Sequence, residues 1–232
     1  PSSPYLCIGY HQVLNSVLDI EVCKDLNLPI MRRFLGGGAT YLDCNQIFYQ
    51  CIFHKSRVPW RADEVYQMML DAPVNVLNRI GLRGSLRSVN EVEANSLRIA
   101  GIGGGQVGEA MVVVGNLLVD FDYILMSNVW KVPDQSFRNL ALETMKERVG
   151  TINNLGCNHT LESLESLMTE AFVESFERPV YEAQLESKEI EDGRNAAIEL
   201  SSFEFLSLHN TVEKVKPMKS LKISADVFIH HI

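Results

Sequence analysis

The residues best suited to chemistry stand close together between positions 32 and 43. Two arginines, Arg32 and Arg33, precede three consecutive glycines, Gly36–Gly38, and Asp43 follows them. Glycine lets another group approach the backbone N–H groups, and a guanidinium offers a fork of donors. Together these groups suit an anion such as a phosphate or a carboxylate. The alternative is a glycine-rich hairpin with solvated arginines, because a glycine run alone is a weak motif.

A second glycine-dense segment, 101–108, predicts another loop at which a ligand approaches the backbone. It follows a predicted β-hairpin over 88–101, in which Asn95 and Ser96 form the turn. An apolar strand is predicted directly after it, over 111–120. Because two glycine loops beside buried strands cost backbone entropy, their presence favours a ligand-binding role.

The elements that must position these glycines are a mixture of strands and helices. Alternating apolar residues predict strands, and apolar residues three and four apart predict helices. The other predicted strands cover 4–10, 29–35 and 47–53, and the predicted helices cover 14–26, 61–77, 123–131, 136–148, 161–172 and 185–200. Residues 210–232 alternate lysines with apolar residues, which is typical of one or two edge strands.

The composition excludes several classes of function. The chain has 232 residues, a net charge of −8 and a pI near 5.3, which argue against a nucleic-acid-binding surface. Its apolar runs are too short to span a membrane, and its first residues do not resemble a signal peptide. The five cysteines show no zinc-binding spacing and lie mostly among apolar residues. We therefore expect reduced thiols in a cytoplasmic protein.

The string RRFLGGGATYLD, which runs from Arg32 to Asp43, resembles the lipoyl-binding loop of the lipoate–protein ligase A family. The family's usual string is RRxxGGGAVxHD, so Leu42 stands where the family has histidine. The resemblance is to the archaeal-type branch and runs to about His209. It implies the biotin/lipoyl protein ligase fold, which is class II synthetase-like: an α+β fold with a mixed, largely antiparallel sheet flanked by helices.

Two further strings carry the same resemblance. Asn90-Glu91 resembles the family's Asn-Asp, which lies near the nucleotide and its magnesium. Leu97–Gly101 resembles the family's (R/K)-K-I-(S/A)-G, but Arg98 stands where the family has its catalytic lysine. A cation there stabilises the charge that develops when a carboxylate attacks a phosphate. Arginine keeps the charge, but its planar fork does not reproduce the point charge of an ammonium.

The resemblance implies an ATP-dependent lipoate–protein ligase. Such an enzyme uses Mg2+ and ATP to form lipoyl-adenylate from lipoate, and then transfers the lipoyl group to a lysine of a lipoyl-domain acceptor protein. The implied site has Arg98 as the catalytic residue, Asn90 and Glu91 at the nucleotide, Glu91 at the metal, and a lipoate-binding set of Arg33, Gly36, Gly37, Gly38, Leu42 and Gly101. Leu35 and Ile102 are predicted to line the acyl tunnel beside Leu42.

Two other hypotheses stay open. Replacement of the catalytic lysine by Arg98, together with Leu42, favours a non-catalytic paralogue that binds lipoate or lipoyl-adenylate or serves as an assembly partner. An octanoyltransferase of the same fold would act through a cysteine without ATP. The sequence disfavours this third hypothesis, because no cysteine lies in the segment 90–101.

The resemblance also predicts the domain organisation. Residues 1–209 correspond to the ligase-like catalytic domain, without the helix and strand that precede this segment in the family. Residues 210–232 are expected to form a C-terminal strand extension or the start of an accessory domain. Some relatives carry that accessory domain in the same chain and others on a separate chain, so a separate accessory chain is a further expected partner.

Overall fold

The computed structural model describes residues 1, 3–176, 178–210 and 220–231. Its larger sheet has five strands in the order β4-β8-β7-β6-β5, and all neighbouring strands are antiparallel. The strands are β4 Gln46–His54, β5 Gly84–Ser88, β6 Glu91–Ala94, β7 Leu97–Val107 and β8 Ala110–Leu118.

One face of this sheet is packed against two helices, α3 (Ala62–Arg79) and α6 (Leu161–Phe176). Side chains alternate between the faces of a strand, so one face of β4, β6, β7 and β8 supplies apolar residues to this core. Val92, Ile102 and Val113 are examples from β6, β7 and β8. The opposite face is therefore left for the rest of the chain and for ligands.

A smaller, mixed sheet lies on that opposite side, in the order β2-β1-β3. Its strands are β1 Tyr5–Ile8, β2 Ile30–Arg32 and β3 Thr40–Leu42, with β1 parallel to β2 and antiparallel to β3. The α+β fold with a mixed, largely antiparallel sheet is confirmed. The glycine segment is not a hairpin, because β1 lies between the strands that flank it.

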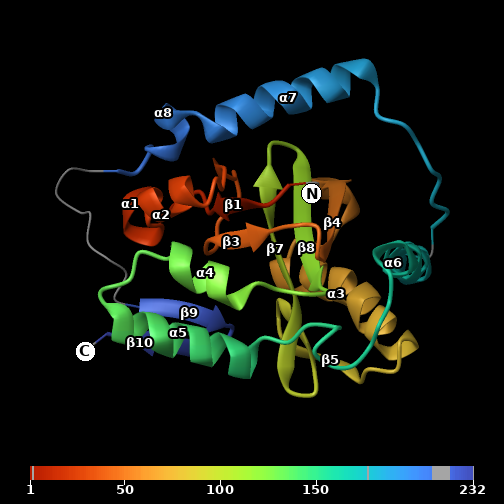
Figure 1. The fold of residues 1–232 in the computed structure, drawn as a ribbon. Helices are drawn as coiled ribbons and strands as arrows, with labels where there is room; N and C mark the ends of the chain where they lie inside the picture. The colour runs from red at the N-terminus through yellow and green to blue at the C-terminus, as the bar shows by residue number, and fades with distance from the viewer. Residues whose placement is uncertain (2, 177, 211–219, 232) are drawn as a thin grey trace.

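Short helices and a C-terminal hairpin enclose a second apolar core beside the small sheet (Figure 1). The helices are α1 Leu14–Val17, α2 Ile20–Asp25, α4 Tyr123–Val129 and α5 Gln135–Arg148. The hairpin is formed by β9 (Ser220–Ser224) and β10 (Val227–His230), which pair with each other. Leu221, Ile223 and Ile229 of the hairpin are buried in this core, so the hairpin is anchored by burial of apolar side chains.

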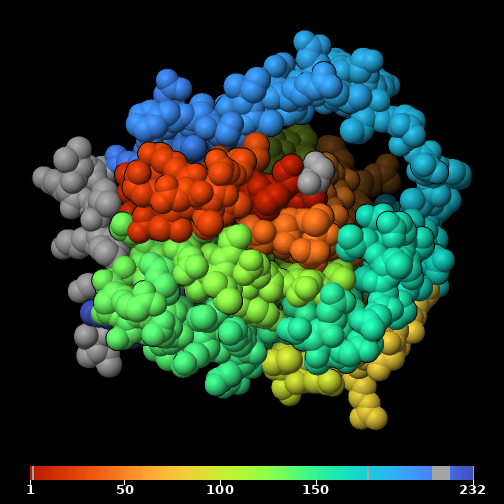
Figure 2. All heavy atoms as spheres, in the orientation of Figure 1, coloured from red at the N-terminus to blue at the C-terminus, as the bar shows by residue number. Residues whose placement is uncertain are grey.

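The remaining helices of the described chain contribute no fully buried residue, although Leu206 in the last of them packs against the second core. The single-turn helix η1 is Lys55–Arg57, and the C-terminal pair is α7 (Ser187–Ser201) and α8 (Phe203–Leu206). On the face seen in Figure 2, α7 and α8 lie against the N-terminal segment, and both contact β2. The side chain of Ser202 begins α8 by accepting a hydrogen bond from the N–H of Phe205 (3.2 Å).

Three local predictions were wrong, and one strand was missed. The helix predicted over 14–26 is divided into α1 and α2, because Leu18 is extended and forms a β-bridge with Trp130. Val89 lies in a turn before β6, not in the strand, and residues 84–88 form a strand that was not predicted. The predicted glycine loop over 101–108 is strand for all but its last residue. Predictions for Lys214, Lys216 and Lys219 lie outside the described residues.

Candidate functional site

The glycine segment 36–38 is folded back onto the turn that follows β1. The N–H of Tyr10 donates to the carbonyl of Leu35 (2.9 Å). A Cβ atom placed on Gly9 would collide with the carbonyl oxygen of Gly37, so only glycine permits this approach. Gly37 itself has φ +97°, a conformation that L side chains rarely adopt. The shape of this loop therefore depends on glycine at both positions.

Arg33 holds the glycine loop from within. Its Nε and Nη2 atoms donate to the carbonyl of Gly36 (3.1 and 2.8 Å), and Nη2 also donates to that of Gly38 (2.8 Å). Its Nη1 donates to the carbonyl of Cys7 in β1 (3.1 Å). Arg33 thus fixes the loop against the small sheet, while Gly36–Gly38 are exposed. Its role as a lipoate-binding residue stays a prediction.

Arg32 is a structural residue that the sequence did not distinguish from Arg33. It is 0% exposed and donates to five backbone carbonyl groups at distances of 2.6–3.2 Å. These carbonyls belong to Gly9, Tyr10, Gln12, Phe205 and Leu206. Burial lowers the pKa of Arg32. The residue therefore joins the turn after β1 to α8, which lies more than 170 residues further along the chain.

Three glycines of β7 form a strip of bare backbone on the face opposite α3 and α6. Gly101, Gly103 and Gly105 alternate with residues of the core and so share one face. A Cβ atom on Gly103 would meet nothing within 4 Å, whereas one on Gly105 would lie 3.1 Å from Cδ2 of Leu35. The strip is therefore uncovered at Gly103, and at Gly105 it meets the side chain of Leu35, the residue before the glycine loop.

The other end of the strip lies at Arg98. A register shift between Val92 and Glu93 adds one residue to β7, so that Arg98 and Gly101 share a face although they are three residues apart. A Cβ atom on Gly101 would collide with Nη2 of Arg98. The guanidinium is therefore directed along the strip, and the two predicted halves of the site are connected through it.

Arg98 is paired with Glu91, which lies on the neighbouring strand. Its Nε is 3.3 Å from Oε1 of Glu91, and burial lowers the pKa of Arg98 while the Glu91 carboxylate opposes that shift. Glu91 is 5% exposed, and its Oε2 accepts a hydrogen bond from the N–H of Ala225 (3.0 Å). Both carboxylate oxygens of Glu91 are thus in contact with groups of the protein.

The amide of Asn90 occupies the turn before β6. Its Oδ1 accepts from the hydroxyl of Ser88 (3.1 Å), and its Nδ2 donates to the carbonyl of Ile102 (3.4 Å). Leu42 is buried in β3, while Ile102 packs in the core with α3 and α6, away from the strip. Among the other residues predicted to line a tunnel, Leu35 contacts the strip directly.

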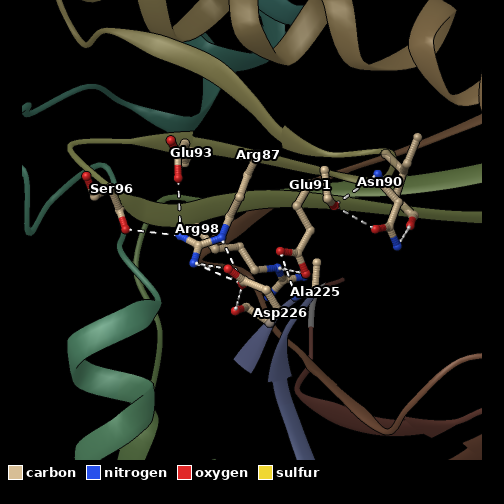
Figure 3. Close-up of polar contacts among 11 residues, drawn as sticks. Arg87, Asn90, Glu91, Glu93, Ser96, Arg98, Ala225 and Asp226 are labelled. Carbon is tan, nitrogen blue, oxygen red and sulfur yellow. Dashed lines mark hydrogen bonds and ion pairs between the residues drawn. The ribbon is translucent and has the colours of Figure 1, made fainter. Parts of the chain in front are cut away.

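The sequence missed Arg87, which lies beside Arg98 (Figure 3). Nε and Nη2 of Arg87 form a fork on the carboxylate of Asp226 (3.0–3.3 Å), and Nη1 donates to Glu93 (3.2 Å) and to the carbonyl of Ser96 (3.1 Å). Asp226 lies in the turn between β9 and β10, next to Ala225. The C-terminal hairpin therefore reaches two charged residues of the candidate site.

Metal-binding geometry is limited at this site. Within the described part of the chain, no group of three or more His, Cys, Asp and Glu side chains is arranged to hold a metal ion. Glu91 supplies one hard oxygen donor, and Mg2+ in nucleotide sites is commonly held by one or two carboxylates together with phosphate oxygens and water. Glu91 fits such a site with the nucleotide as co-ligand. In the same described part, no helix is long and apolar enough to cross a membrane.

Comparison with known proteins agrees with this fold. Residues 1–173 match the family described as the lipoyl protein ligase A/B catalytic domain. Since the match covers well over half of the chain, the chain belongs to this family.

Individual relatives are ligases and octanoyltransferases. Lipoate-protein ligase A subunit 1 of Thermoplasma acidophilum is 26% identical over 192 residues, which cover 78% of this chain and 72% of the relative. A probable lipoate-protein ligase A of Mycoplasma pneumoniae is 25% identical over 71% of this chain and 49% of its own length. An octanoyltransferase of Clostridioides difficile is 22% identical over 78% of this chain and 74% of its own length.

Solved structures of ligases share the fold. The bipartite lipoate protein ligase of Thermoplasma acidophilum, studied with its E2 lipoyl domain, gives a TM-score of 0.81 at 24% identity, covering 90% of this chain and 82% of that chain. A lipoate-protein ligase A bound with ATP gives 0.74 at 23% identity, covering 89% and 83%. The predicted biotin/lipoyl ligase fold is thereby confirmed.

Proposed function

We propose that this chain is an ATP-dependent lipoate–protein ligase that forms lipoyl-adenylate and transfers the lipoyl group to a lysine of a lipoyl-domain protein. The observation that carries the proposal is the glycine strip, which extends from Arg98 to Leu35 beside the glycine loop. From Gly101 to Gly105 it is about 13 Å long at the usual rise of a strand. An extended acyl chain of lipoate's size fits along it, with the carboxylate at Arg98.

The first step joins two anions. An oxygen of the lipoate carboxylate bonds to the α-phosphorus of ATP, and pyrophosphate leaves with the electron pair of the broken P–O bond. Arg98, which is held by Glu91 and directed along the strip, would screen that repulsion and stabilise the developing charge. Asn90 would contact the nucleotide, and Arg33 would keep the glycine loop in place around the acyl group.

The second step transfers the acyl group. The neutral amine of an acceptor lysine attacks the acyl carbonyl, AMP leaves, and the amine releases a proton. Glu91 would hold Mg2+ together with phosphate oxygens, and that ion would neutralise phosphate charge when bound. By similarity to the bipartite Thermoplasma ligase and its E2 lipoyl domain, we expect a lipoyl domain as acceptor and an accessory chain as a second partner.

The test is lipoate-dependent exchange between ATP and pyrophosphate, with and without an accessory chain. We expect exchange in the wild type, a loss of more than about a hundredfold in Arg98→Ala, and measurable exchange in Arg98→Lys, because one positioned charge commonly contributes that much. Absence of exchange in both the wild type and Arg98→Lys would contradict the ligase. Arg148→Ala, an exposed arginine at the end of α5, is the control variant.

The second candidate is a non-catalytic paralogue that binds lipoyl-adenylate. It is favoured by the contacts of Glu91, because both oxygens of its carboxylate already have partners, one in Arg98 and one in the N–H of Ala225. Calorimetry separates the two candidates: tight binding of lipoyl-adenylate without exchange supports the binding protein, whereas binding with exchange supports the enzyme.

A further inference from the structure

Arg87 is an arginine beside Arg98 to which neither the resemblance nor the proposed mechanism assigns a role. Its side chain is 12% exposed, and each of its nitrogen atoms has a partner. Two of the partners, Glu93 of β6 and the carbonyl of Ser96 in the turn before β7, both accept from Nη1 and hold that side of the guanidinium. The other edge, Nε and Nη2, is occupied only by Asp226.

The partner on that second edge, Asp226, lies outside the large sheet and is mostly exposed. Asp226 belongs to the hairpin turn, and its side chain is 66% exposed, whereas the hairpin itself is anchored by Leu221, Ile223 and Ile229 in the core. The exposed Asp226 carboxylate can be hydrated when it leaves Arg87, which offsets the loss of the fork and of the hydrogen bond from the Ser224 hydroxyl (3.2 Å). The carboxylate can therefore leave Arg87 by a rotation of its own side chain, while the hairpin stays docked.

The vacated edge has the chemistry of a phosphate site. The Nε–Nη2 fork of an arginine binds two oxygens of a phosphate as it binds two oxygens of a carboxylate. Displacement of Asp226 also reduces the negative charge around the incoming phosphate. Arg87 and Arg98 carry two positive charges among the three carboxylates of Glu91, Glu93 and Asp226, so displacement of Asp226 leaves two positive and two negative charges at the site (Figure 3).

We propose that Arg87 is a phosphate-binding residue of the nucleotide site. In the free protein, Asp226 of the C-terminal hairpin occupies the Nε–Nη2 edge of Arg87 until a polyphosphate displaces it. The inference rests on the proposed function for the identity of the nucleotide, but the subsite itself binds any polyphosphate. The hairpin turn is thus a built-in competitor that lowers the affinity for ATP without blocking the site.

The experiment measures dissociation constants for ATP and for inorganic triphosphate by calorimetry on the full chain. Asp226→Asn removes the competing charge and keeps the size of the side chain. We expect it to bind both probes at least about threefold more tightly than the wild type, since even a fully exposed ion pair contributes a factor of about this order. Asp63→Asn is the matched control, because Asp63 accepts the same Nε and Nη2 fork from Arg61 (3.0 and 2.6 Å) on an exposed surface of α3.

A double-mutant cycle tests whether Arg87 is the residue that is released. In an Arg87→Lys background, which lacks the fork, we expect Asp226→Asn to change neither affinity by more than about 1.5-fold. An equal gain in both backgrounds, or the same gain in Asp63→Asn, indicates a general effect of charge and overturns the proposal. Unchanged or weaker binding by Asp226→Asn also overturns it.

The two probes separate this inference from the proposed function. If triphosphate binds with the expected dependence on Asp226 but ATP does not bind, the phosphate subsite stands and the nucleotide function fails. If ATP binds equally well to the wild type and Asp226→Asn, the ligase proposal stands and the competitor is excluded. If neither probe binds to any variant, both proposals are contradicted.

Discussion

Two pairs of arginines lie at the two ends of the candidate site, and their partners differ. Arg32 and Arg33, beside the glycine loop, donate mostly to backbone carbonyl groups. Arg87 of β5 and Arg98 of β7 are paired mainly with carboxylates. A carbonyl is part of the folded backbone and stays where it is. A carboxylate on a side chain can be replaced by another anion, so only the second pair is arranged for exchange.

This difference changes the interpretation of the sequence. The segment RRxxGGG was predicted to present cations and N–H groups to an anion. In the structure, the N–H groups of both arginines donate mostly to backbone carbonyls of the protein itself. Arg32 connects the turn after β1 to α8, and Arg33 holds the loop carbonyls. At the other end of the strip, Arg87 and Arg98 face acidic side chains instead.

The largest expected effect is on stability. Arg32→Met removes the five donors and keeps the apolar stem, so several carbonyls lose their partner in the interior; we expect unfolding to become easier by on the order of 3–5 kcal/mol. Denaturant titration measures it. Arg33→Met is the control, with an expected loss of about 1 kcal/mol, because most of its bonds are exposed. Equal losses in the two variants would contradict the distinction drawn between them.

An intermediate effect is expected at the strip that joins the two pairs. A Cβ atom on Gly103 meets nothing in the free protein, so Gly103→Ala should fold with unchanged or slightly higher stability, by about 0.5 kcal/mol. If the acyl chain lies on the bare backbone, the same methyl group weakens lipoate binding by about tenfold, through overpacking. Thermal unfolding and calorimetry with lipoate check the two parts. Unchanged lipoate affinity would move the acyl site away from β7.

The smallest effect concerns acid sensitivity. The hydrogen bond from Arg87 lowers the pKa of Asp226. The stabilising contribution of this pair is therefore present above the unfolded pKa, about 4, and is lost as the pH falls through the lower folded pKa. The stability difference between wild type and Asp226→Asn should shrink in that acidic range, as followed by denaturant titration. A constant difference down to pH 2 would show that Arg87 does not hold Asp226 in solution.

The family and much of the secondary structure could be predicted from local residues. The strings around Gly36–Gly38 and Leu97–Gly101 indicated the family, and the turn at Asn95 and Ser96 is where it was predicted, with both residues at positive φ. The segment 101–108 was misinterpreted because glycine is read locally as a loop former. Here the pairing of β7 with β6 and β8 overrides that preference.

The sequence by itself determined the class of fold, the family and the residue types at the two ends of the site, because these follow from short-range spacing and motif. Only the tertiary structure decided which groups the arginines contact. Arg32 meets carbonyls from α8, and Arg87 meets Asp226 from a hairpin 139 residues away. A side chain's partner depends on which segments fold against it, and four arginines of the same type therefore divide into two that hold the backbone and two that face exchangeable charge.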